Sequence, residues 1–140
     1  MRLSIRNRLA GEVVAVEAGE VMGTVRVALG GGLEITAAIT LESVRELGLS
    51  SGQRVVALVK STEVAIGLGE LPRMSIRNRL PGRITEVEHG AVMTTVQLAT
   101  AGGDTVTAAI TKDAAEDLGL EPGLDAIALI KSTEVSIALT

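Results

Sequence analysis

The hexapeptide Ser-Ile-Arg-Asn-Arg-Leu occupies residues 4–9 and recurs without change at residues 75–80. The offset of 71 residues holds through the rest of the chain without a gap. Thr36–Thr40, for example, is repeated as Thr107–Thr111. Self-similarity at one fixed spacing indicates a duplicated structural unit. We therefore predict two tandem domains, residues 1–69 and 70–140.

Within one repeat, hydrophobic residues alternate with polar ones over several short stretches, as in half-buried strands. Val25 and Val27, for example, lie on one face of such a stretch. Strands are expected at residues 13–17, 21–29, 33–39, 54–59 and 63–68, with a short helix at residues 41–47. Five short strands with one helix between the third and fourth are typical of an OB-type barrel. The predicted fold is all-β with one short helix per repeat, forming two tandem OB-type five-stranded β-barrels.

The composition excludes several classes of function. The 140 residues include no cysteine, which excludes disulfides and thiolate metal sites. The net charge is −4 and there is no Phe, Tyr or Trp, so an OB-fold that stacks bases along a basic groove is disfavoured. Neither a signal peptide nor an apolar run of about 20 residues is visible, so we expect a cytoplasmic protein without a membrane partner.

Domains of under about 70 residues bury a modest core and usually need help from metals, disulfides or partners. Cysteine is absent and there is one histidine, so association is the remaining source of stability. The mean hydropathy is positive in the absence of a membrane segment, which indicates apolar surface buried in interfaces. We predict a homo-oligomer. Met22 and Met93 are expected to fill the core.

The repeated hexapeptide is the first candidate binding segment. If it is a strand, Ser4, Arg6 and Arg8 project to one face. A hydroxyl donor then lies beside a guanidinium, which offers several donors and no acceptor and suits an oxyanion. Ser75 and Arg77 repeat this pair. The alternative is an exposed edge strand that carries charges.

Two further segments offer hydrogen-bond donors. Thr40 precedes the expected helix, where it can cap the free N–H groups and contribute to an anion site, and Ser43 lies three residues further on. Alternatively, Thr40 caps its own helix and does nothing else. The segment Lys60-Ser61-Thr62 follows an apolar strand and combines an ammonium with two hydroxyls, unless its lysine is simply solvated. The second repeat supplies Thr111, Lys131, Ser132 and Thr133.

The three segments share donor character and require no carboxylate or imidazole. A donor-only site suits a fully deprotonated tetrahedral dianion such as molybdate, tungstate or sulfate, whereas hydrogen phosphate needs an acceptor for its proton. No base, nucleophile or metal is arranged for catalysis, so we expect a binding protein that is not an enzyme and has no cofactor. The residues do not choose among the dianions.

The Ser-x-Arg-Asn start, the threonine before the helix and the late Lys-Ser, in that order and twice over, resemble the molbindin (Mop-domain) family in its tandem di-Mop form. The resemblance implies an OB-type barrel, intracellular molybdate or tungstate binding and storage at domain and subunit interfaces, and a homotrimer. It implies these ligand residues: Ser4, Arg6, Thr40, Ser43, Lys60, Ser61, Ser75, Arg77, Thr111, Lys131 and Ser132. Ala114 stands where Ser43 stands in the first half, so the second half is expected to lose a hydroxyl. A structural module and a nucleic-acid-binding OB-fold module remain as alternatives.

Overall fold

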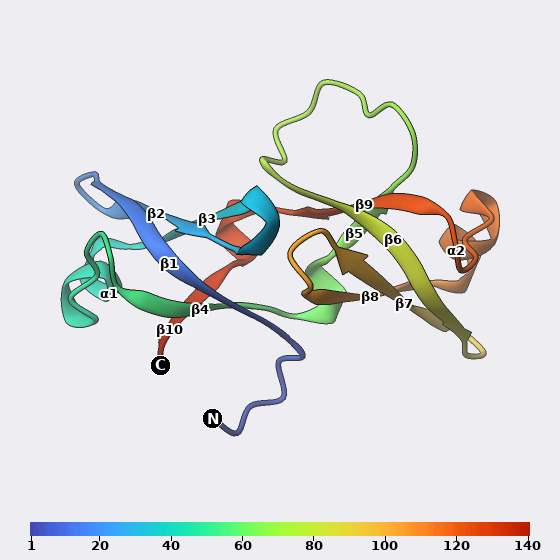
Figure 1. Ribbon diagram of the computed structural model, residues 1–140, viewed down its shortest axis with the longest axis horizontal. Coiled ribbons are helices and arrows are strands. Elements are labelled where there is room, and N and C mark those ends of the chain that lie inside the picture. The colour runs from blue at the N-terminus through green and yellow to red at the C-terminus, as the bar shows by residue number, and fades with distance from the viewer.

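The computed structural model describes all 140 residues and shows two five-stranded sheets that lie side by side along the long axis (Figure 1). The first half contains β1 (Asn7–Ala18), β2 (Met22–Ala28), β3 (Glu34–Thr40), α1 (Leu41–Glu46), β4 (Arg54–Val59) and β5 (Ala65–Gly67). The second half contains β6 (Asn78–His89), β7 (Met93–Thr100), β8 (Thr105–Thr111), α2 (Lys112–Leu118), β9 (Asp125–Ile130) and β10 (Ser136–Leu139). Short 3-10 helices span Gly30–Gly32 (η1), Ser61–Glu63 (η2) and Ser132–Glu134 (η3). No helix is long and apolar enough to cross a membrane.

The predicted fold class is confirmed, because each sheet has five strands and one short helix lies between the third and fourth strands of each repeat. The predicted fourth strand, residues 54–59, matches β4 residue for residue. The predicted first strand at residues 13–17 is too short, since β1 begins at residue 7. The predicted fifth strand at residues 63–68 is too long, because residues 61–63 form η2 instead.

One long strand organises each barrel. In the first barrel, residues 7–12 of β1 pair with β4, and residues 12–18 pair with β2. The change of partner falls next to a β-bulge at Val14, where the register shifts between Val13 and Ala15. A bulge bends a strand and increases its twist, which lets one strand belong to both sides of a closed barrel. The equivalent bulge in β6 lies between Ile84 and Glu86.

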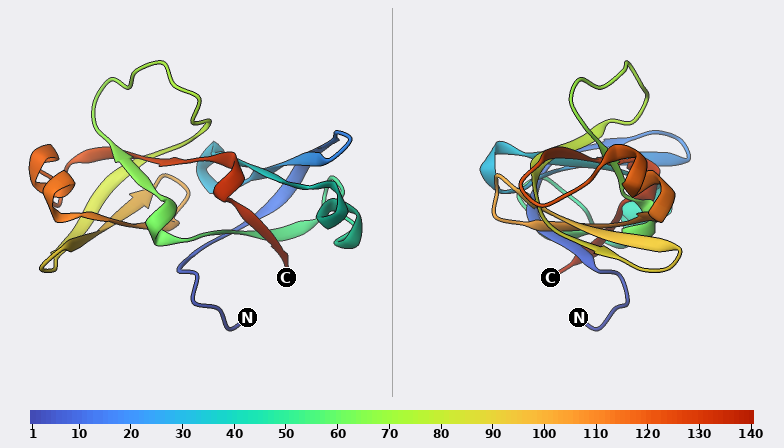
Figure 2. Two further views of the ribbon diagram at one scale, coloured as in Figure 1. Left: turned by 180° about the vertical axis from the view of Figure 1, so that it is seen from behind. Right: turned by 90° about the vertical axis from the view of Figure 1, so that its right-hand side faces the viewer.

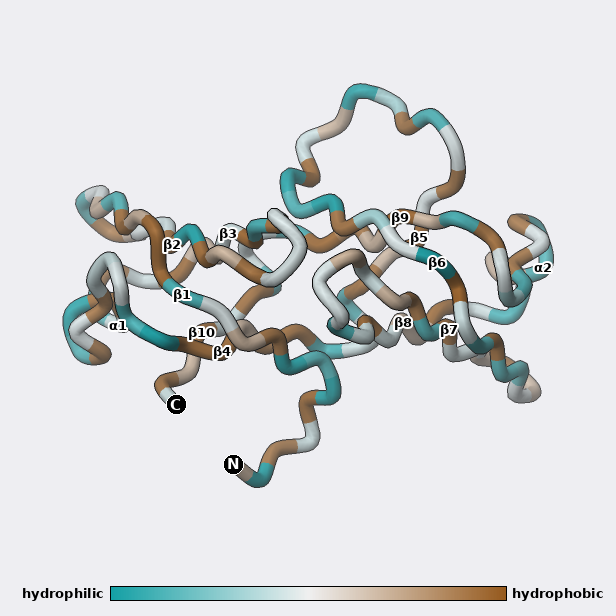
Figure 3. The backbone as a smooth tube through the Cα atoms, in the orientation of Figure 1, coloured by the Kyte–Doolittle hydropathy of each residue, from teal (hydrophilic) through white to brown (hydrophobic).

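Small branched side chains fill the barrels at every second position. Val25 and Val27 of β2 and Ile35 and Ala37 of β3 have no exposed surface. All the buried apolar residues of both barrels except Leu58 and Leu129 form a single connected cluster. Figure 3 shows the apolar positions alternating with polar ones along the strands. Because β-branched side chains pack well on a pleated surface, a core without aromatic rings is sufficient here.

The last strand of each repeat crosses to the other barrel. The strand order is β10-β4-β1-β2-β3 in the first sheet and β5-β9-β6-β7-β8 in the second. β10 pairs antiparallel with β4, and β5 pairs with β9 in the same way. Figures 1 and 2 show β10 running from the second barrel into the first, and the linker after β5 standing away from the body. The predicted boundary at residues 69 and 70 concerns the sequence repeat, and each sheet combines strands from both sides of it.

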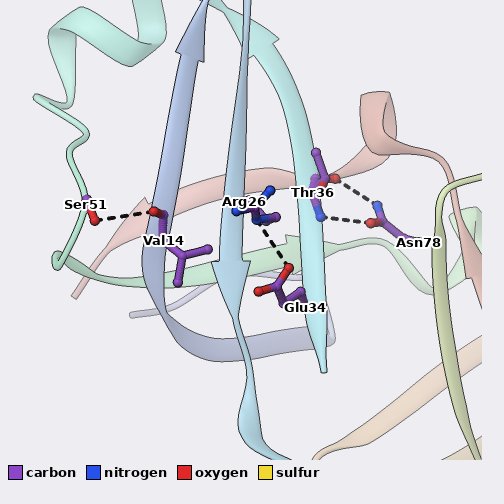
Figure 4. A network of polar contacts seen from close by, with 6 residues as sticks. All are labelled: Val14, Arg26, Glu34, Thr36, Ser51 and Asn78. Carbon is purple, nitrogen blue, oxygen red and sulfur yellow. Dashed lines mark hydrogen bonds and ion pairs between the residues drawn. The ribbon is translucent and has the colours of Figure 1, made fainter. Parts of the chain in front are cut away.

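Two buried asparagines tie the barrels together. Asn78 of β6 donates through Nδ2 to the carbonyl oxygen of Thr36 and accepts from the Thr36 N–H, both at 2.8 Å (Figure 4). Asn7 of β1 bonds Thr107 of the opposite barrel in the same manner, at 2.8 and 2.7 Å. Each side-chain amide thus imitates one rung of a β-ladder along the outer strand of the other sheet. We call these two contacts the asparagine bridges.

The loops between the second and third strands of the two barrels meet without side chains between them. A Cβ placed on Gly102 would lie 2.4 Å from the carbonyl oxygen of Gly30, and one on Gly30 would lie 2.8 Å from the Gly102 oxygen. No ordinary side chain fits at either position without moving backbone. The glycine-rich loops are therefore needed where the barrels touch, in addition to closing their hairpins.

Asn78→Ala should lower the free energy of unfolding by about 2–3 kcal/mol, because two hydrogen bonds are lost and the partly buried backbone groups of Thr36 lose their partner. Urea unfolding monitored by circular dichroism measures this change. Thr24→Ala is the matched control, since Thr24 is exposed on β2 and makes no side-chain hydrogen bond. An Asn78→Ala midpoint equal to that of Thr24→Ala would show that the asparagine bridges carry no stability.

Candidate functional site

Only part of the repeated hexapeptide is a strand. Because β1 begins at Asn7, the condition that Ser4, Arg6 and Arg8 share one face of a strand is not met by Ser4 and Arg6. Asn7 pairs with Val59, the last residue of β4, so no ladder partner remains for the residues before it. The same is true of β6, whose first residue Asn78 pairs with Ile130 at the end of β9. The two candidate ligands of each motif therefore lie in an irregular segment just outside the sheet.

The strand register gathers cations at this edge of each sheet. Because Asn7 faces Val59, the neighbouring residues Arg6 and Lys60 leave the ladder at the same end. Both are exposed. Lys60 leads directly into η2, where its carbonyl oxygen accepts from the N–H of Glu63 at 2.9 Å. We call this arrangement of an arginine and a lysine beside a 3-10 turn the cationic corner.

The second barrel repeats the cationic corner. Asn78 faces Ile130, so Arg77 and Lys131 leave the ladder together. Lys131 leads into η3 in the same way, with a hydrogen bond of 3.0 Å from the N–H of Glu134 to its carbonyl oxygen. Two distant segments of the sequence thus leave the sheet at the same edge in both barrels.

The serines of these segments have free hydroxyls. Ser4 and Ser75 are exposed, and Ser61 and Ser132 are half-buried. None of the four makes a side-chain hydrogen bond within the chain. All four can therefore donate to a bound anion without breaking a contact of the fold.

Thr40 caps α1, as predicted. Its Oγ1 accepts from the N–H of Ser43 at 3.2 Å and donates to Ser43 Oγ at 2.8 Å. In the second repeat, Thr111 Oγ1 accepts from the N–H of Ala114 at 3.1 Å and has no side chain to donate to. Each helix start therefore keeps one free hydroxyl donor. In the first half it is on Ser43, and in the second half, where Ala114 replaces that serine, it is on Thr111 at the N-cap.

One pocket joins candidate residues of the second half to the first half of the chain. It has a volume of about 430 Å³ and brings Thr111 and Lys131 together with Ile76, next to Arg77. Residues 62–65 of the first half complete its wall, because β5 crosses into this barrel. The carboxylate of Glu63 also lines the pocket, so this pocket is not lined by donors alone.

The methionine prediction is wrong. The exposed fractions of Met22 and Met93 are 44% and 42%, and their neighbours Val21 and Val92 are 75% and 72% exposed. These residues lie at the tips of the β1–β2 and β6–β7 hairpins, which project past the core. The pairs occur at equivalent positions of both halves, which leaves matched apolar surface at two places on the molecule.

The acidic side chains near these clusters, such as Glu63, do not form a metal site. No group of three or more His, Cys, Asp or Glu side chains is placed to hold a metal ion. Burial raises the pKa of the Asp104 carboxyl, which lies in the loop between β7 and β8 and is not among the candidate residues.

Sequence reasoning missed two roles within the hexapeptide. Asn7 and Asn78 form the asparagine bridges, and Arg8 and Arg79 bind backbone carbonyl groups of the preceding segment. The available signal was that Asn7 alternates with the apolar residues Ile5 and Leu9, because an asparagine on a buried face needs a partner for its amide.

Comparison with known proteins gives one family. The model of the TOBE domain matches residues 3–66 and again residues 74–137. The molybdenum-pterin-binding protein MopB of Rhodobacter capsulatus is 45% identical over 140 residues, which are 99% of this chain and 52% of that protein. The molybdenum transport protein ModE of Azotobacter vinelandii is 38% identical over 139 residues, with coverage of 99% and 52%. The chain thus spans about half the length of these curated relatives.

A solved structure is similar over its whole length. The crystal structure of the cytoplasmic molybdate-binding protein ModG, in a form with molybdate bound, superposes with a TM-score of 0.96. The two sequences are 41% identical, and the match covers 100% of both chains. The overall architecture, in which each barrel takes its outer strand from the other half, is thus similar to one already seen with an oxyanion bound.

Proposed function

Because the chain belongs to the TOBE domain family, we propose that it binds molybdate or tungstate in the cell and serves in storage and homeostasis of that oxyanion. The observation that carries the proposal is the cationic corner, which the fold builds twice from the same residue types. The similarity to a molybdate-binding protein over the full chain supports the choice of ligand. It also favours a cytoplasmic location.

The proposed ligands are those of the sequence motifs. Arginine and lysine supply charge, and the hydroxyls of serine and threonine supply neutral donors, so the set can surround a tetrahedral dianion with hydrogen-bond donors. The set comprises Ser4, Arg6, Thr40, Ser43, Lys60, Ser61, Ser75, Arg77, Thr111, Lys131 and Ser132. Hydrogen phosphate carries a proton that needs an acceptor, and the arginines and lysines of the set supply none, which favours a fully ionised dianion.

We also propose that several copies of the chain assemble around the binding sites. The cationic corners are exposed, and an exposed charge pair binds a small anion weakly because water competes. Apposition of further copies of the chain would exclude water and add donors from the second copy. The exposed Val21 and Val92 offer matched apolar surface for such contacts, and the family resemblance favours a homotrimer.

The proposal is a binding activity without catalysis. The relatives described above are named for binding and transport, and the candidate residues contain no nucleophile–base pair. Nothing in the structure favours the nucleic-acid alternative, since the chain is acidic and has no aromatic side chain for base stacking.

Isothermal titration with molybdate, tungstate, sulfate and phosphate tests the ligand. We expect binding heat with molybdate and tungstate and none with phosphate. In an Arg6→Ala/Arg77→Ala double variant the heat with molybdate should disappear, because both cationic corners lose their arginine. An Arg54→Ala/Arg83→Ala variant removes the same charge at the far ends of the β1–β4 and β6–β9 ladders and should bind as the unmodified chain does. Absence of heat with all four anions from the folded protein would refute the proposed function.

The mass in solution tests the assembly. Light scattering after size exclusion should give three times the 14.4 kDa mass of the chain. A Val21→Glu/Val92→Glu variant should give a smaller mass, since a carboxylate at either hairpin tip would have to be buried in the contact between copies without a partner. A single-chain mass for the unmodified protein across micromolar concentrations would contradict the assembly.

A further inference from the structure

The segment that precedes each long strand lacks a ladder partner, yet a side chain holds it. In the first barrel Arg8 Nη2 donates to the carbonyl oxygen of Leu3 at 2.7 Å, and Nε donates to that of Ile5 at 3.1 Å. Nη1 donates to the carbonyl oxygen of Met1 at 3.3 Å. The first two carbonyl groups stand on either side of Ser4. One guanidinium therefore fixes the backbone on both sides of a proposed ligand.

The second barrel reproduces this contact with the same atoms. Arg79 Nε donates to the carbonyl oxygen of Ile76 at 3.2 Å, and Nη2 donates to that of Met74 at 3.4 Å. These carbonyl groups stand on either side of Ser75. The contact recurs although Leu3 of the first copy is Met74 in the second. The repeated contact thus comes from the motif itself.

Geometry explains why this position is an arginine. The planar guanidinium presents several donors in a fixed fork and can bind two or three carbonyl groups at once. A lysine carries the same charge but a single ammonium, and cannot hold the same spread of acceptors in one plane. Because its donors are committed to carbonyl groups, this arginine has a different role from Arg6, which has no hydrogen bond within the chain.

The geometry points to Arg8 and Arg79 as positioning residues for oxyanion binding, which hold Ser4 and Arg6, and Ser75 and Arg77, in place through their backbone. The inference rests on the proposed function. The positions of the hexapeptide then have separate roles. Its serine and first arginine face the ligand, its asparagine joins the barrels, and its second arginine orders the segment that carries the ligand residues. Ordering this segment before binding removes an entropy cost from the binding step.

The test compares Arg8→Lys/Arg79→Lys and Arg8→Ala/Arg79→Ala with the unmodified chain. Both variants should bind molybdate about tenfold more weakly in isothermal titration, as is typical when a group that orients a ligand residue is removed. The amides of Ser4, Arg6, Ser75 and Arg77 should show lower heteronuclear nuclear Overhauser effects without ligand, because the segment becomes mobile. An Arg54→Lys/Arg83→Lys variant, whose side chains hold no loop carbonyl groups, is the matched control and should change neither readout.

The other outcomes contradict either the inference or the proposed function on which it rests, and the two are distinguishable. Unchanged affinity in the lysine variant would mean that the charge alone matters. Weaker binding with unchanged Overhauser effects would make these arginines direct ligands. If the unmodified chain binds no anion, the proposed function fails. The Overhauser effects then still decide whether Arg8 and Arg79 order their segments.

Discussion

Each sheet of this protein is completed by a strand from the other half of the chain, and the rest of the structure depends on that exchange. β10 supplies the outer strand beside β4, and β5 supplies the one beside β9. Both crossing strands follow directly from the 3-10 turns that carry Ser61 and Ser132. The turns are thus fixed at both ends, by a ladder in one barrel and a ladder in the other. The asparagine bridges also join one barrel to the other, so side-chain hydrogen bonds and crossing strands together hold the two halves in contact.

The candidate site is a consequence of this junction. The ladder between β1 and β4 ends at Asn7 and Val59, because the chain must leave the sheet there to cross over. Arg6 and Lys60 are therefore delivered to the same edge. If the proposed function holds, most positions of the unchanged hexapeptide have a role. Its asparagine and second arginine serve the structure, and its serine and first arginine remain free for a ligand. The structural and functional interpretations of the motif thus apply to different positions within it.

Much of one barrel could be predicted from local pattern. Period-two burial at Val25 and Val27 located a strand, and Thr40 located the helix start, because both signals act over a few residues. The exchange could not be predicted, since residues 65–67 have the same pattern whether they pair with their own sheet or with the other. The partner of Asn7 lies 100 residues away, at Thr107, and nothing near Asn7 in the sequence indicates it. Met22 was misplaced because a methionine beside a strand is expected in the core until the length of the hairpin is known.

The exchange of strands is tested most directly by deleting residues 136–140 and following backbone hydrogen exchange by mass spectrometry. We predict that protection falls in β4 of the first barrel, whose residues 55–58 lose their ladder partner, while β9 of the second barrel keeps its protection. Loss of protection in β9 with β4 unchanged would mean that β10 pairs within its own repeat, and would contradict the exchange.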